Sequence, residues 1–339
     1  MERIWIAGPC AAENREQLLA TAAQLAVQVQ EKGLSLSYFR AGAWKVRSAP
    51  DSFAGAGENA LPWLQEVQNA YNIPVCVEVM NAKQVELCAK HGIHAVWVGA
   101  RTSVNPVEVQ QIADAVKHSE FTVMIKNPMI PDLKLWIGNI ERFLQADIQD
   151  VMAIHRGFPD FQENIYRNTP LWHIPIELKV QMPELPILCD PSHLCGKVEW
   201  IPEVAQLAMN YGFNGLMVEC HPLPGQALSD AEQQMTPSEW ADMISCLDLR
   251  TDTADLELVK QRSTLENIDN QLGELLYQRM RIVDEIADIK RKKHIAVIQP
   301  QQWQHVVERY KKHNEDADYQ IFIEKFLQLL HQTSIDRQK

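Results

Sequence analysis

Two hydrophobic patterns follow one another along the chain, and the change falls near residue 250. Before that point, short apolar runs alternate with stretches in which apolar residues recur every three or four positions, as in buried strands and amphipathic helices. The expected strands are Ile4–Ala7, Leu36–Phe39, Val75–Val79, Ala95–Val98, Phe121–Ile125, Val151–Ile154, Ile187–Leu188 and Leu216–Val218. Helical stretches such as Glu16–Glu31, Ala82–His91 and Pro106–Lys117 lie between them. Eight strands alternating with helices predict an α/β fold, a (β/α)8 (TIM) barrel, with an open doubly wound sheet as the alternative.

The last helix of this first part has a clear predicted start. Thr236 is followed by Pro237 and, three positions after the threonine, by Glu239. This spacing predicts a capping box with proline at the first helical position.

The second pattern is a heptad repeat of apolar residues from about Ala254 to Lys293. It predicts one helix about 60 Å long at 1.5 Å per residue. Shorter helices are expected around Gln301–His313 and Asp318–Asp336. Because the long helix cannot bury its apolar seam alone, we expect partner helices and a homodimer or higher homo-oligomer. The predicted domains are therefore a barrel at 1–250 and an all-helical domain at 251–339.

The amino-acid composition and net charge indicate which kinds of partner the protein binds. The net charge is −12 and the pI is near 5.4, which argues against nucleic acid or an anionic membrane as the main partner. The seven cysteines form no CxxC pair, as expected for a reduced intracellular protein. Neither a signal peptide nor a membrane span is predicted. We expect a soluble, cytoplasmic protein that binds small anions at a few basic loops.

Polar residues of two kinds stand at or just after the predicted strand ends, where barrel active sites lie. The cations are Arg40, Lys45, Arg47, Arg101, Lys126 and Arg156. Arginine and lysine at such positions suit phosphate and carboxylate groups. The metal-type residues are Cys10, His193, Glu219 and Asp230. A thiolate, an imidazole and two carboxylates suit one divalent ion such as Mn, Fe, Co or Zn, without choosing among them.

These residues belong to motifs that occur together in a known family. The motifs are Ile6-Ala7-Gly8-Pro9-Cys10, the Arg40 to Ser48 loop with Lys45 and Arg47, Val98-Gly99-Ala100-Arg101, Ile125-Lys126, His155-Arg156-Gly157, Asp190-Pro191-Ser192-His193, Met217-Val218-Glu219 and Leu228-Ser229-Asp230. In this order they resemble the short, single-barrel type of 3-deoxy-D-arabino-heptulosonate 7-phosphate (DAHP) synthase, which condenses phosphoenolpyruvate with erythrose 4-phosphate. One departure is Val46, where that family usually has proline.

The resemblance implies a role for each residue. The implied metal ligands are Cys10, His193, Glu219 and Asp230. The implied phosphoenolpyruvate site is Arg40, Lys45, Arg101, Lys126 and Arg156, and the implied sugar-phosphate site is Arg47 and Ser48. Lys45 is the expected proton donor, and a bound metal would polarise the sugar aldehyde. The rival is the related synthase that makes 3-deoxy-octulosonate 8-phosphate, whose key loop typically reads Lys-Ala-Asn-Arg-Ser; here one residue separates Lys45 from Arg47.

The helical domain carries cations at unusual positions. Arg279 occupies a seam position where an apolar residue is expected, and a buried unpaired arginine needs an anion. Lys290 lies about 16 Å further on nearly the same face, whereas Arg262 is about 25 Å away, too far to share a ligand unless a second chain supplies it. With Ser334 and Gln338, these residues resemble the ligand set of the all-helical chorismate mutases, which are intertwined dimers.

The match to the mutases is incomplete. Where those enzymes commonly carry a carboxylate, an arginine and a glutamate, this chain has Gln299, Gln302 and Trp303. The alternative is therefore a non-catalytic module for regulation and dimerisation. Because the first expected strand begins at Ile4, we expect no N-terminal regulatory domain. We expect instead that the mutase product, prephenate, inhibits the barrel through the helical domain.

Overall fold

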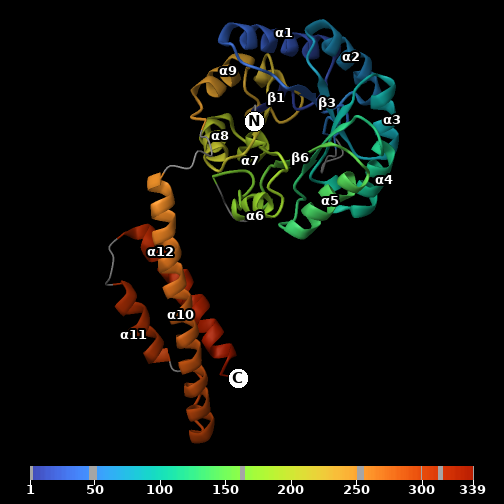
Figure 1. The fold of residues 1–339 in the computed structure, drawn as a ribbon. Coiled ribbons are helices and arrows are strands. Elements are labelled where there is room, and N and C mark those ends of the chain that lie inside the picture. The colour runs from blue at the N-terminus through green and yellow to red at the C-terminus, as the bar shows by residue number, and fades with distance from the viewer. Residues whose placement is uncertain are drawn as a thin grey trace. The chain divides into compact units, whose positions relative to one another are not determined.

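The computed structural model describes residues 3–45, 52–160, 165–249, 256–298, 300–311 and 316–338. The chain divides into two compact units, Met1–Asp252 and Thr253–Lys339. The first contains all the described strands, and the second contains three helices within the described residues (Figure 1).

Eight parallel strands form a closed barrel in the first unit. They are β1 (Ile4–Gly8), β2 (Tyr38–Ala41), β3 (Val75–Val79), β4 (Ala95–Val98), β5 (Thr122–Lys126), β6 (Asp150–His155), β7 (Ile187–Cys189) and β8 (Gly215–Glu219). The barrel closes where β1 pairs with β8, from Ile4 opposite Gly215 to Gly8 opposite Glu219. This closure confirms the predicted barrel and excludes the open doubly wound sheet.

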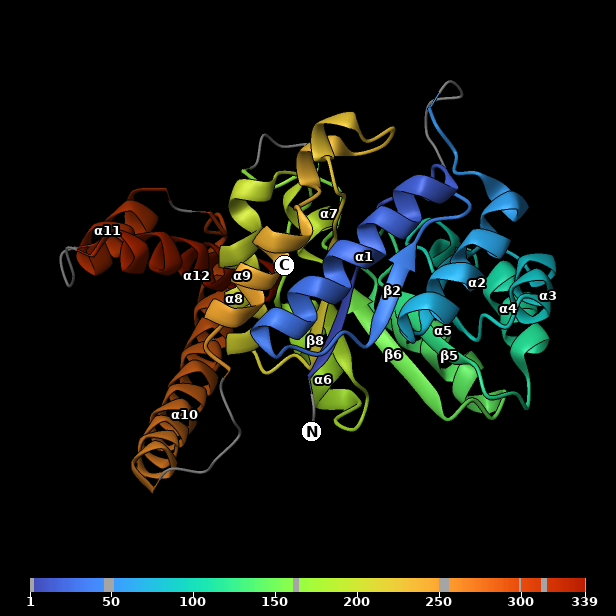
Figure 2. The same ribbon diagram turned by 90° about the horizontal axis from the view of Figure 1, so that it is seen from above.

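The helices of the first unit form a ring outside the strands, seen along the barrel in Figure 1 and from the side in Figure 2. They are α1 (Arg15–Lys32), α2 (Ala60–Tyr71), α3 (Ala82–Lys90), α4 (Pro106–Val116), α5 (Leu133–Gln145), α6 (His173–Gln181), α7 (Pro191–Cys195), α8 (Ile201–Asn210) and α9 (Pro237–Cys246), with 3₁₀ turns η1 (Gly57–Asn59), η2 (Thr102–Val104), η3 (Val198–Trp200), η4 (Pro224–Gln226) and η5 (Ala231–Gln233). The predicted capping box at α9 is confirmed, since the Thr236 and Glu239 side chains each bond the other's backbone N–H.

Side chains of the strands alternate between two apolar layers, as the two-residue period of a strand requires. In β4, Trp97 belongs to a cluster inside the barrel, whereas Val96 and Val98 belong to the cluster between strands and helices. Trp97 is fully buried and lies beneath the carboxyl-end rim. The side chain of a residue at a strand end therefore reaches the rim only when the alternation along the strand directs it into the barrel.

The second unit consists of α10 (Leu256–Lys293), α11 (Pro300–Lys311) and α12 (Ala317–Asp336). Its small core includes Val283 and Ala287 of α10 and Ile323 and Leu327 of α12. A further apolar set on α10 stays 42–61 % exposed in the single chain, namely Leu258, Leu265, Ile268, Leu272 and Leu275. The predicted long helix is thus present, with a large apolar surface that its own chain leaves uncovered. None of the described helices contains an apolar stretch that could cross a bilayer.

Candidate active site

The strand ends bring predicted metal-type and cationic residues to one rim. Arg40 lies in β2, Lys126 ends β5 and Glu219 ends β8. Cys10 follows β1, whose last residue, Gly8, has a φ of 145°. A Cβ on Gly8 would lie 2.2 Å from the backbone oxygen of Arg40, so glycine is required for β1 and β2 to approach at this end.

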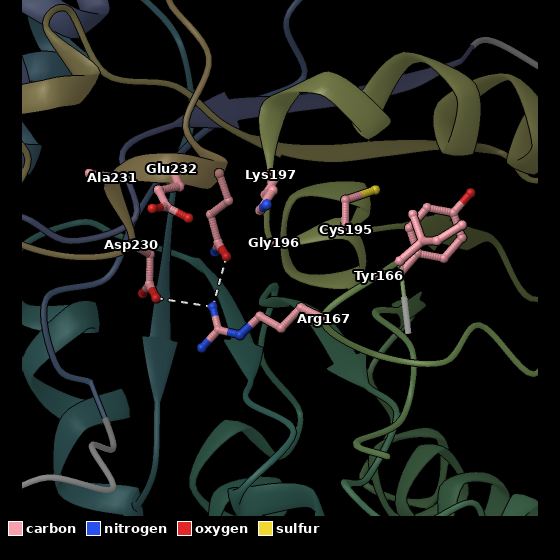
Figure 3. Close-up of a pocket in the computed structure, with 10 residues that line it drawn as sticks. Tyr166, Arg167, Cys195, Gly196, Lys197, Asp230, Ala231 and Glu232 are labelled. Carbon is pink, nitrogen blue, oxygen red and sulfur yellow. Dashed lines mark hydrogen bonds and ion pairs between the residues drawn. The ribbon is translucent and has the colours of Figure 1, made fainter. Parts of the chain in front are cut away.

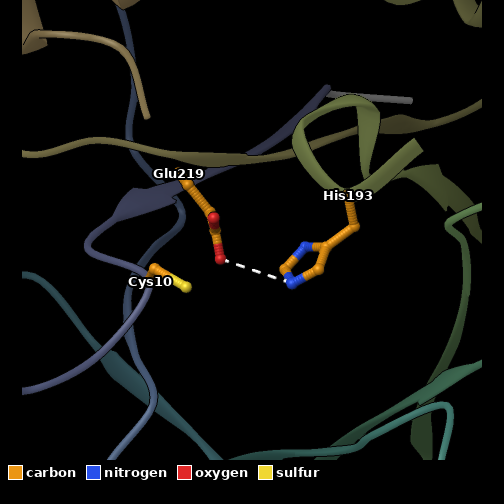
Figure 4. A group of neighbouring side chains, drawn as sticks. All are labelled: Cys10, His193 and Glu219. Carbon is orange, nitrogen blue, oxygen red and sulfur yellow. Dashed lines mark ion pairs between the residues drawn. The ribbon is translucent and has the colours of Figure 1, made fainter. Parts of the chain in front are cut away.

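Three ligating groups converge at the centre of the rim (Figure 4). One donor atom each from Cys10, His193 and Glu219 lies within 4.8 Å of the others, and Cys10 and Glu219 are fully buried. Asp230 joins this group from the loop after β8, with its Oδ2 3.1 Å from the Cys10 Sγ. These donors fit a divalent transition ion, because a thiol, an imidazole and carboxylates face a common point.

His193 is oriented for ligation by Asp190. The Nδ1 of His193 lies 2.8 Å from Asp190 Oδ2; the two groups are not aligned as in a hydrogen bond, but the nearby carboxylate favours the tautomer with the proton on Nδ1. The Nε2 of His193 then faces Glu219 Oε1, 3.5 Å away, with its lone pair available. Although burial acts to raise it, His193 and Lys126 hold the pKa of Asp190 well below its usual range. The carboxylate therefore remains a hydrogen-bond acceptor at neutral pH.

Glu219 is also charged despite its burial. Burial alone would raise its pKa, but His193 and then Arg40 lower the pKa of Glu219 to about 2. The Arg40 Nη2 lies 2.9 Å from Glu219 Oε1. Among the described residues, the buried Nε and Nη1 of Arg40 find no hydrogen-bond partner. Its guanidinium lies 5.0 Å from the Trp97 ring centroid, so the arginine is held in place with two donors unused.

A polar cavity opens beside this cluster. It is lined by Lys45, Glu78, Gly99, Ala100, Arg101, Lys126, Arg156, Arg167, His193 and Asp230. Lys126 is paired with Asp190 at 2.6 Å, and Arg156 donates to Asn168 Oδ1 at 3.0 Å. Burial lowers the pKa of Arg156 to about 10, so it stays charged at neutral pH. The structure thus brings Lys45, Arg101, Lys126 and Arg156 together around one hollow, with Arg40 beneath the same rim.

Lys45 lies between the metal-type residues and the cavity. Its ammonium contacts the Cys10 Sγ and lies 3.4 Å from Asp230 Oδ2, and its side chain is only 8 % exposed. Burial acts to lower its pKa, but Cys10, Glu219 and Asp230 outweigh this and raise the pKa of Lys45. Arg47 and Ser48, the predicted sugar-phosphate residues, lie outside the described residues.

His155 does not reach the rim, although it stands at a strand end. It follows Ile154, which points into the barrel, and so points outward. There it is fully buried among Trp136, Phe158, Trp172 and Phe213, with ring centroids 5.1–6.5 Å away. Burial lowers the pKa of His155 to about 3. His155 therefore ends a strand without lining the rim, because its position in the strand alternation is outward.

This buried histidine should make the barrel sensitive to acid. Because the folded-state pKa is lowered from 6.5 to about 3, the unfolded chain binds the extra proton between these pH values, and stability falls as pH falls. The free energy of unfolding should drop by about 3 kcal/mol from this group alone between neutral pH and pH 4. In His155→Leu, thermal unfolding of the barrel should lose this part of its pH dependence.

The matched control for that measurement is His118→Asn. The His118 side chain is 66 % exposed, and its φ of 56° is one that asparagine tolerates. This variant should keep the wild-type dependence on pH. Parallel pH profiles for His155→Leu and the wild type would contradict the assignment of acid sensitivity to His155.

Several predicted ligand residues of the second unit also meet. Arg279 Nη1 donates to Ser334 Oγ at 2.8 Å, and Gln338 Nε2 donates to the Ser334 backbone oxygen at 3.0 Å. Lys290 Nζ donates to the backbone oxygen of Val297 at 2.7 Å. Arg279 is half-buried rather than buried in the single chain, because Ser334 and α12 cover only part of it. Arg262 is exposed, and no described contact joins either Arg262 or Lys290 to Arg279, Ser334 and Gln338.

One aromatic pair in the second unit was not expected from the sequence. Trp303 of α11 stacks on His331 of α12, with ring centroids 4.0 Å apart and planes at 18°. Partial burial and the charge of Arg279 both lower the pKa of His331. Gln299 and the side chain of Gln302 lie outside the described residues.

A second hollow adjoins the first and contains a cation that sequence reasoning missed. Its lining includes Arg167, Lys197, Asp230, Glu232 and Gln233 (Figure 3). Arg167 also lines the cavity beside the metal-type cluster. It stands before α6, in the segment after β6 rather than at a strand end, so the strand-end argument could not select it.

Comparison with known proteins agrees with this arrangement. The profile described as DAHP synthetase I family matches residues 2–254, and the profile described as Chorismate mutase type II matches residues 261–339. A phospho-2-dehydro-3-deoxyheptonate aldolase of Thermotoga maritima is 29 % identical over 230 residues, which cover 68 % of this chain and 64 % of the relative. This chain therefore spans less than two thirds of that relative's length.

A second curated relative has a different name. A 2-dehydro-3-deoxyphosphooctonate aldolase of Azoarcus sp. (strain BH72) is 28 % identical over 276 residues, covering 77 % of this chain and 93 % of the relative. Among solved structures, the DAHP synthase of Thermotoga maritima aligns with a TM-score of 0.62 and 27 % identity, over 77 % of this chain and 70 % of that one.

Proposed function

Because the chain belongs to the DAHP synthetase I family and carries a chorismate mutase type II domain at its C-terminal end, we propose that it is a bifunctional enzyme. The barrel condenses phosphoenolpyruvate with erythrose 4-phosphate to give DAHP and phosphate, and the helical domain rearranges chorismate to prephenate. The observation that carries the proposal is the rim, where the Cys10–His193–Glu219 cluster adjoins a cavity lined by lysine and arginine.

The cationic residues have the first task, which is to hold two mutually repelling phosphorylated substrates together. Arg101, Lys126 and Arg156 line the cavity, and the two unused donors of Arg40 suit a phosphate or carboxylate of phosphoenolpyruvate. Arg47 and Ser48 bind the phosphate of erythrose 4-phosphate. Fixing both substrates in reactive geometry supplies on the order of 7–11 kcal/mol.

Cys10, His193, Glu219 and Asp230 hold one divalent ion, which when bound supplies Lewis-acid polarisation of the sugar aldehyde. Lys45 lies beside this group with its proton retained, because neighbouring acidic groups raise its pKa against the effect of burial. As the enol carbon of phosphoenolpyruvate attacks the aldehyde carbon, the aldehyde oxygen gains a proton, and Lys45 Nζ donates it. Water then adds at the neighbouring carbon of the former phosphoenolpyruvate, and phosphate leaves.

The sugar-phosphate aldehyde that is used, erythrose 4-phosphate or arabinose 5-phosphate, is the main difference between the proposed enzyme and the octulosonate synthases. The Azoarcus relative bears the name of such an enzyme. One residue separates Lys45 from Arg47, against two in the typical loop of that family, and this spacing favours the four-carbon sugar. Phosphoenolpyruvate consumption should show a much higher kcat/KM with erythrose 4-phosphate than with arabinose 5-phosphate. The reverse order would overturn the assignment.

In the helical domain, a cationic pocket holds chorismate in a compact conformation and stabilises charge on the breaking ether bond. Arg279, Lys290, Ser334 and Gln338 come from one chain, and Arg262 comes from the second chain of a homodimer. The exposed apolar residues of α10 support such a dimer, since a monomer would leave them in water. Spectrophotometric loss of chorismate tests the activity; its absence in a folded dimer would favour the non-catalytic module.

The helical domain also provides feedback on the barrel. Prephenate is a dianion and enters the Arg262, Arg279 and Lys290 pocket. A coupling of 1–3 kcal/mol, typical of allostery, would change barrel affinity roughly 5–150-fold. We therefore expect added prephenate to inhibit the condensation in the whole chain and not in a chain ending near Leu249. Inhibition that survives the truncation would mean competition within the barrel, and a lack of response in both would contradict the feedback.

A further inference from the structure

Gln233 lies at the end of η5, between an arginine and one of the carboxylates of the metal-type cluster. Its side chain is 1 % exposed. The Nε2 of Gln233 donates to Glu219 Oε2 at 2.7 Å, and its Oε1 accepts from Arg167 Nη1 at 2.7 Å. Chemistry sets this amide orientation, because an ionised carboxylate only accepts hydrogen bonds and a guanidinium only donates them.

The same arginine contacts a second carboxylate. Arg167 Nη1 donates to Asp230 Oδ1 at 3.1 Å, and a dashed line marks this contact in Figure 3. Asp230 itself adopts a left-handed backbone conformation, with a φ of 49°, which costs free energy in a residue other than glycine. The ion pair with Arg167 helps to hold the carboxylate in place, while its other oxygen faces Cys10.

The backbone fixes Arg167 where it can do this. Its N–H donates to the Cys195 backbone oxygen at 3.0 Å. The next residue along that loop, Gly196, has a φ of 75°, and a Cβ there would lie 2.6 Å from the Cβ of Arg167. The close approach of these two loops therefore depends on glycine, and it places the guanidinium over Gln233 and Asp230.

The residue after Gln233 supports the cluster from another side. Gln234 is also 1 % exposed, and its Oε1 accepts from the Cys10 backbone N–H at 3.0 Å. Its Nε2 donates to the Ser229 backbone oxygen at 2.9 Å, next to Asp230. Consecutive glutamines thus hold Glu219 by its side chain and Cys10 by its backbone.

We propose that Gln233 and Arg167 are positioning residues of the metal site, an inference that rests on the proposed metal dependence of the barrel. Arg167 anchors Asp230 directly and Glu219 through Gln233. With its Oε2 held by Gln233, Glu219 presents Oε1 towards His193 and Arg40. Loss of such supporting contacts typically lowers metal affinity by about 10- to 100-fold.

The test uses Gln233→Met and Arg167→Met in the full-length chain. Methionine retains an unbranched chain like the first carbons of glutamine and arginine. It cannot form the hydrogen bonds that the amide or the guanidinium makes. The dissociation constant for Mn²⁺ is measured by competition with a chelating dye, and the Co²⁺ form is examined for the thiolate-to-metal absorption that Cys10 should produce. Both variants should bind Mn²⁺ about 10- to 100-fold more weakly. Their condensation rate should recover substantially when Mn²⁺ is raised to saturation.

The matched control is Gln68→Met. Gln68 also uses both ends of its amide, donating to Gly92 and accepting from Val75 N–H, but it lies at the opposite end of the barrel. This variant should lose stability and keep wild-type metal affinity. Gln68→Met therefore separates the general effect of deleting two hydrogen bonds from an effect on the ligands.

Arg167→Met keeps the test decisive if Gln233→Met does not fold, since the Arg167 side chain is 46 % exposed and its loss leaves little cavity. A Mn²⁺ affinity within about threefold of wild type in a folded variant would overturn the positioning role, because the expected loss is at least about tenfold. If the wild type binds neither Mn²⁺ nor Co²⁺, the metal assignment of the proposed function fails and the inference fails with it. If Mn²⁺ binding depends on Cys10 but not on Gln233 or Arg167, the inference about positioning residues is wrong while the proposed metal site stands.

Discussion

Replacing Cys10 with alanine is expected to abolish the condensation while leaving the barrel folded. The thiol is fully buried and contributes one of three donors that lie within 4.8 Å of one another. Removing it deletes the soft ligand of the predicted metal site. Since Lewis-acid stabilisation is worth several kcal/mol and each 1.36 kcal/mol is tenfold, kcat/KM should fall by at least about a thousandfold. The measurements are phosphoenolpyruvate consumption and metal content.

Chelation and a second cysteine provide the controls for this prediction. Exhaustive chelation should inactivate the wild type, and Mn²⁺ or a similar ion should restore it but not restore Cys10→Ala. Cys88→Ala removes an equally buried thiol from α3, which contributes no donor to the cluster, and should lose stability without losing activity. Full activity in Cys10→Ala, or in wild type after chelation, would rule out the metal assignment.

The barrel could be predicted from local sequence patterns, whereas its closure could not. Alternating apolar runs and helical stretches are local signals, and the strands lie within a few residues of the predicted ranges. The observation that separates a barrel from an open sheet is the pairing of Ile4 with Gly215. No periodicity near either residue specifies that partner, because it depends on the combined curvature of all the strands between them.

The candidate site could be predicted only in part, because sequence position places a residue at a strand end without giving its direction. Arg40 and Glu219 point to the rim as expected, whereas His155 points into an aromatic layer. Gln233 and Arg167 were missed because neither stands at a strand end. A usable signal was the pair of glutamines shortly after Asp230, since consecutive amides beside a predicted metal ligand suit side-chain support.

In the helical domain, the heptad repeat indicated the apolar seam, and the resemblance named Arg279 and Ser334 as ligand residues, whereas the contact between these two side chains could not be read from the sequence. The contact between Arg279 and Ser334 joins α10 to the C-terminal part of α12, 55 positions later in the sequence. Arg262 is exposed on the same long helix as Arg279. No described contact joins Arg262 to Arg279, which is the reason to expect that a partner chain completes each proposed pocket.

Mixing two inactive variants should restore chorismate mutase activity if the pocket is shared between chains. Arg262→Ala and Arg279→Ala should each be inactive alone, because each homodimer lacks one cation in both pockets. In a heterodimer of the two variants, one of the two shared pockets lacks both cations and the other has both. Since half the dimers in an equal mixture are heterodimers, about a quarter of the wild-type sites should return. Chorismate consumption after subunit exchange measures this recovery.

A second mixture, of wild type with a double variant, distinguishes a shared pocket from a pocket built within one chain. When wild type is mixed with the double variant Arg262→Ala/Arg279→Ala, every heterodimer has one defective cation in each shared pocket, so activity should fall below that of the wild-type subunits present. A pocket built within one chain predicts the opposite in both experiments, with no recovery in the first mixture and no loss in the second. Demonstrated heterodimers that follow this opposite pattern would refute the shared site and would require Arg262 to act elsewhere than beside Arg279.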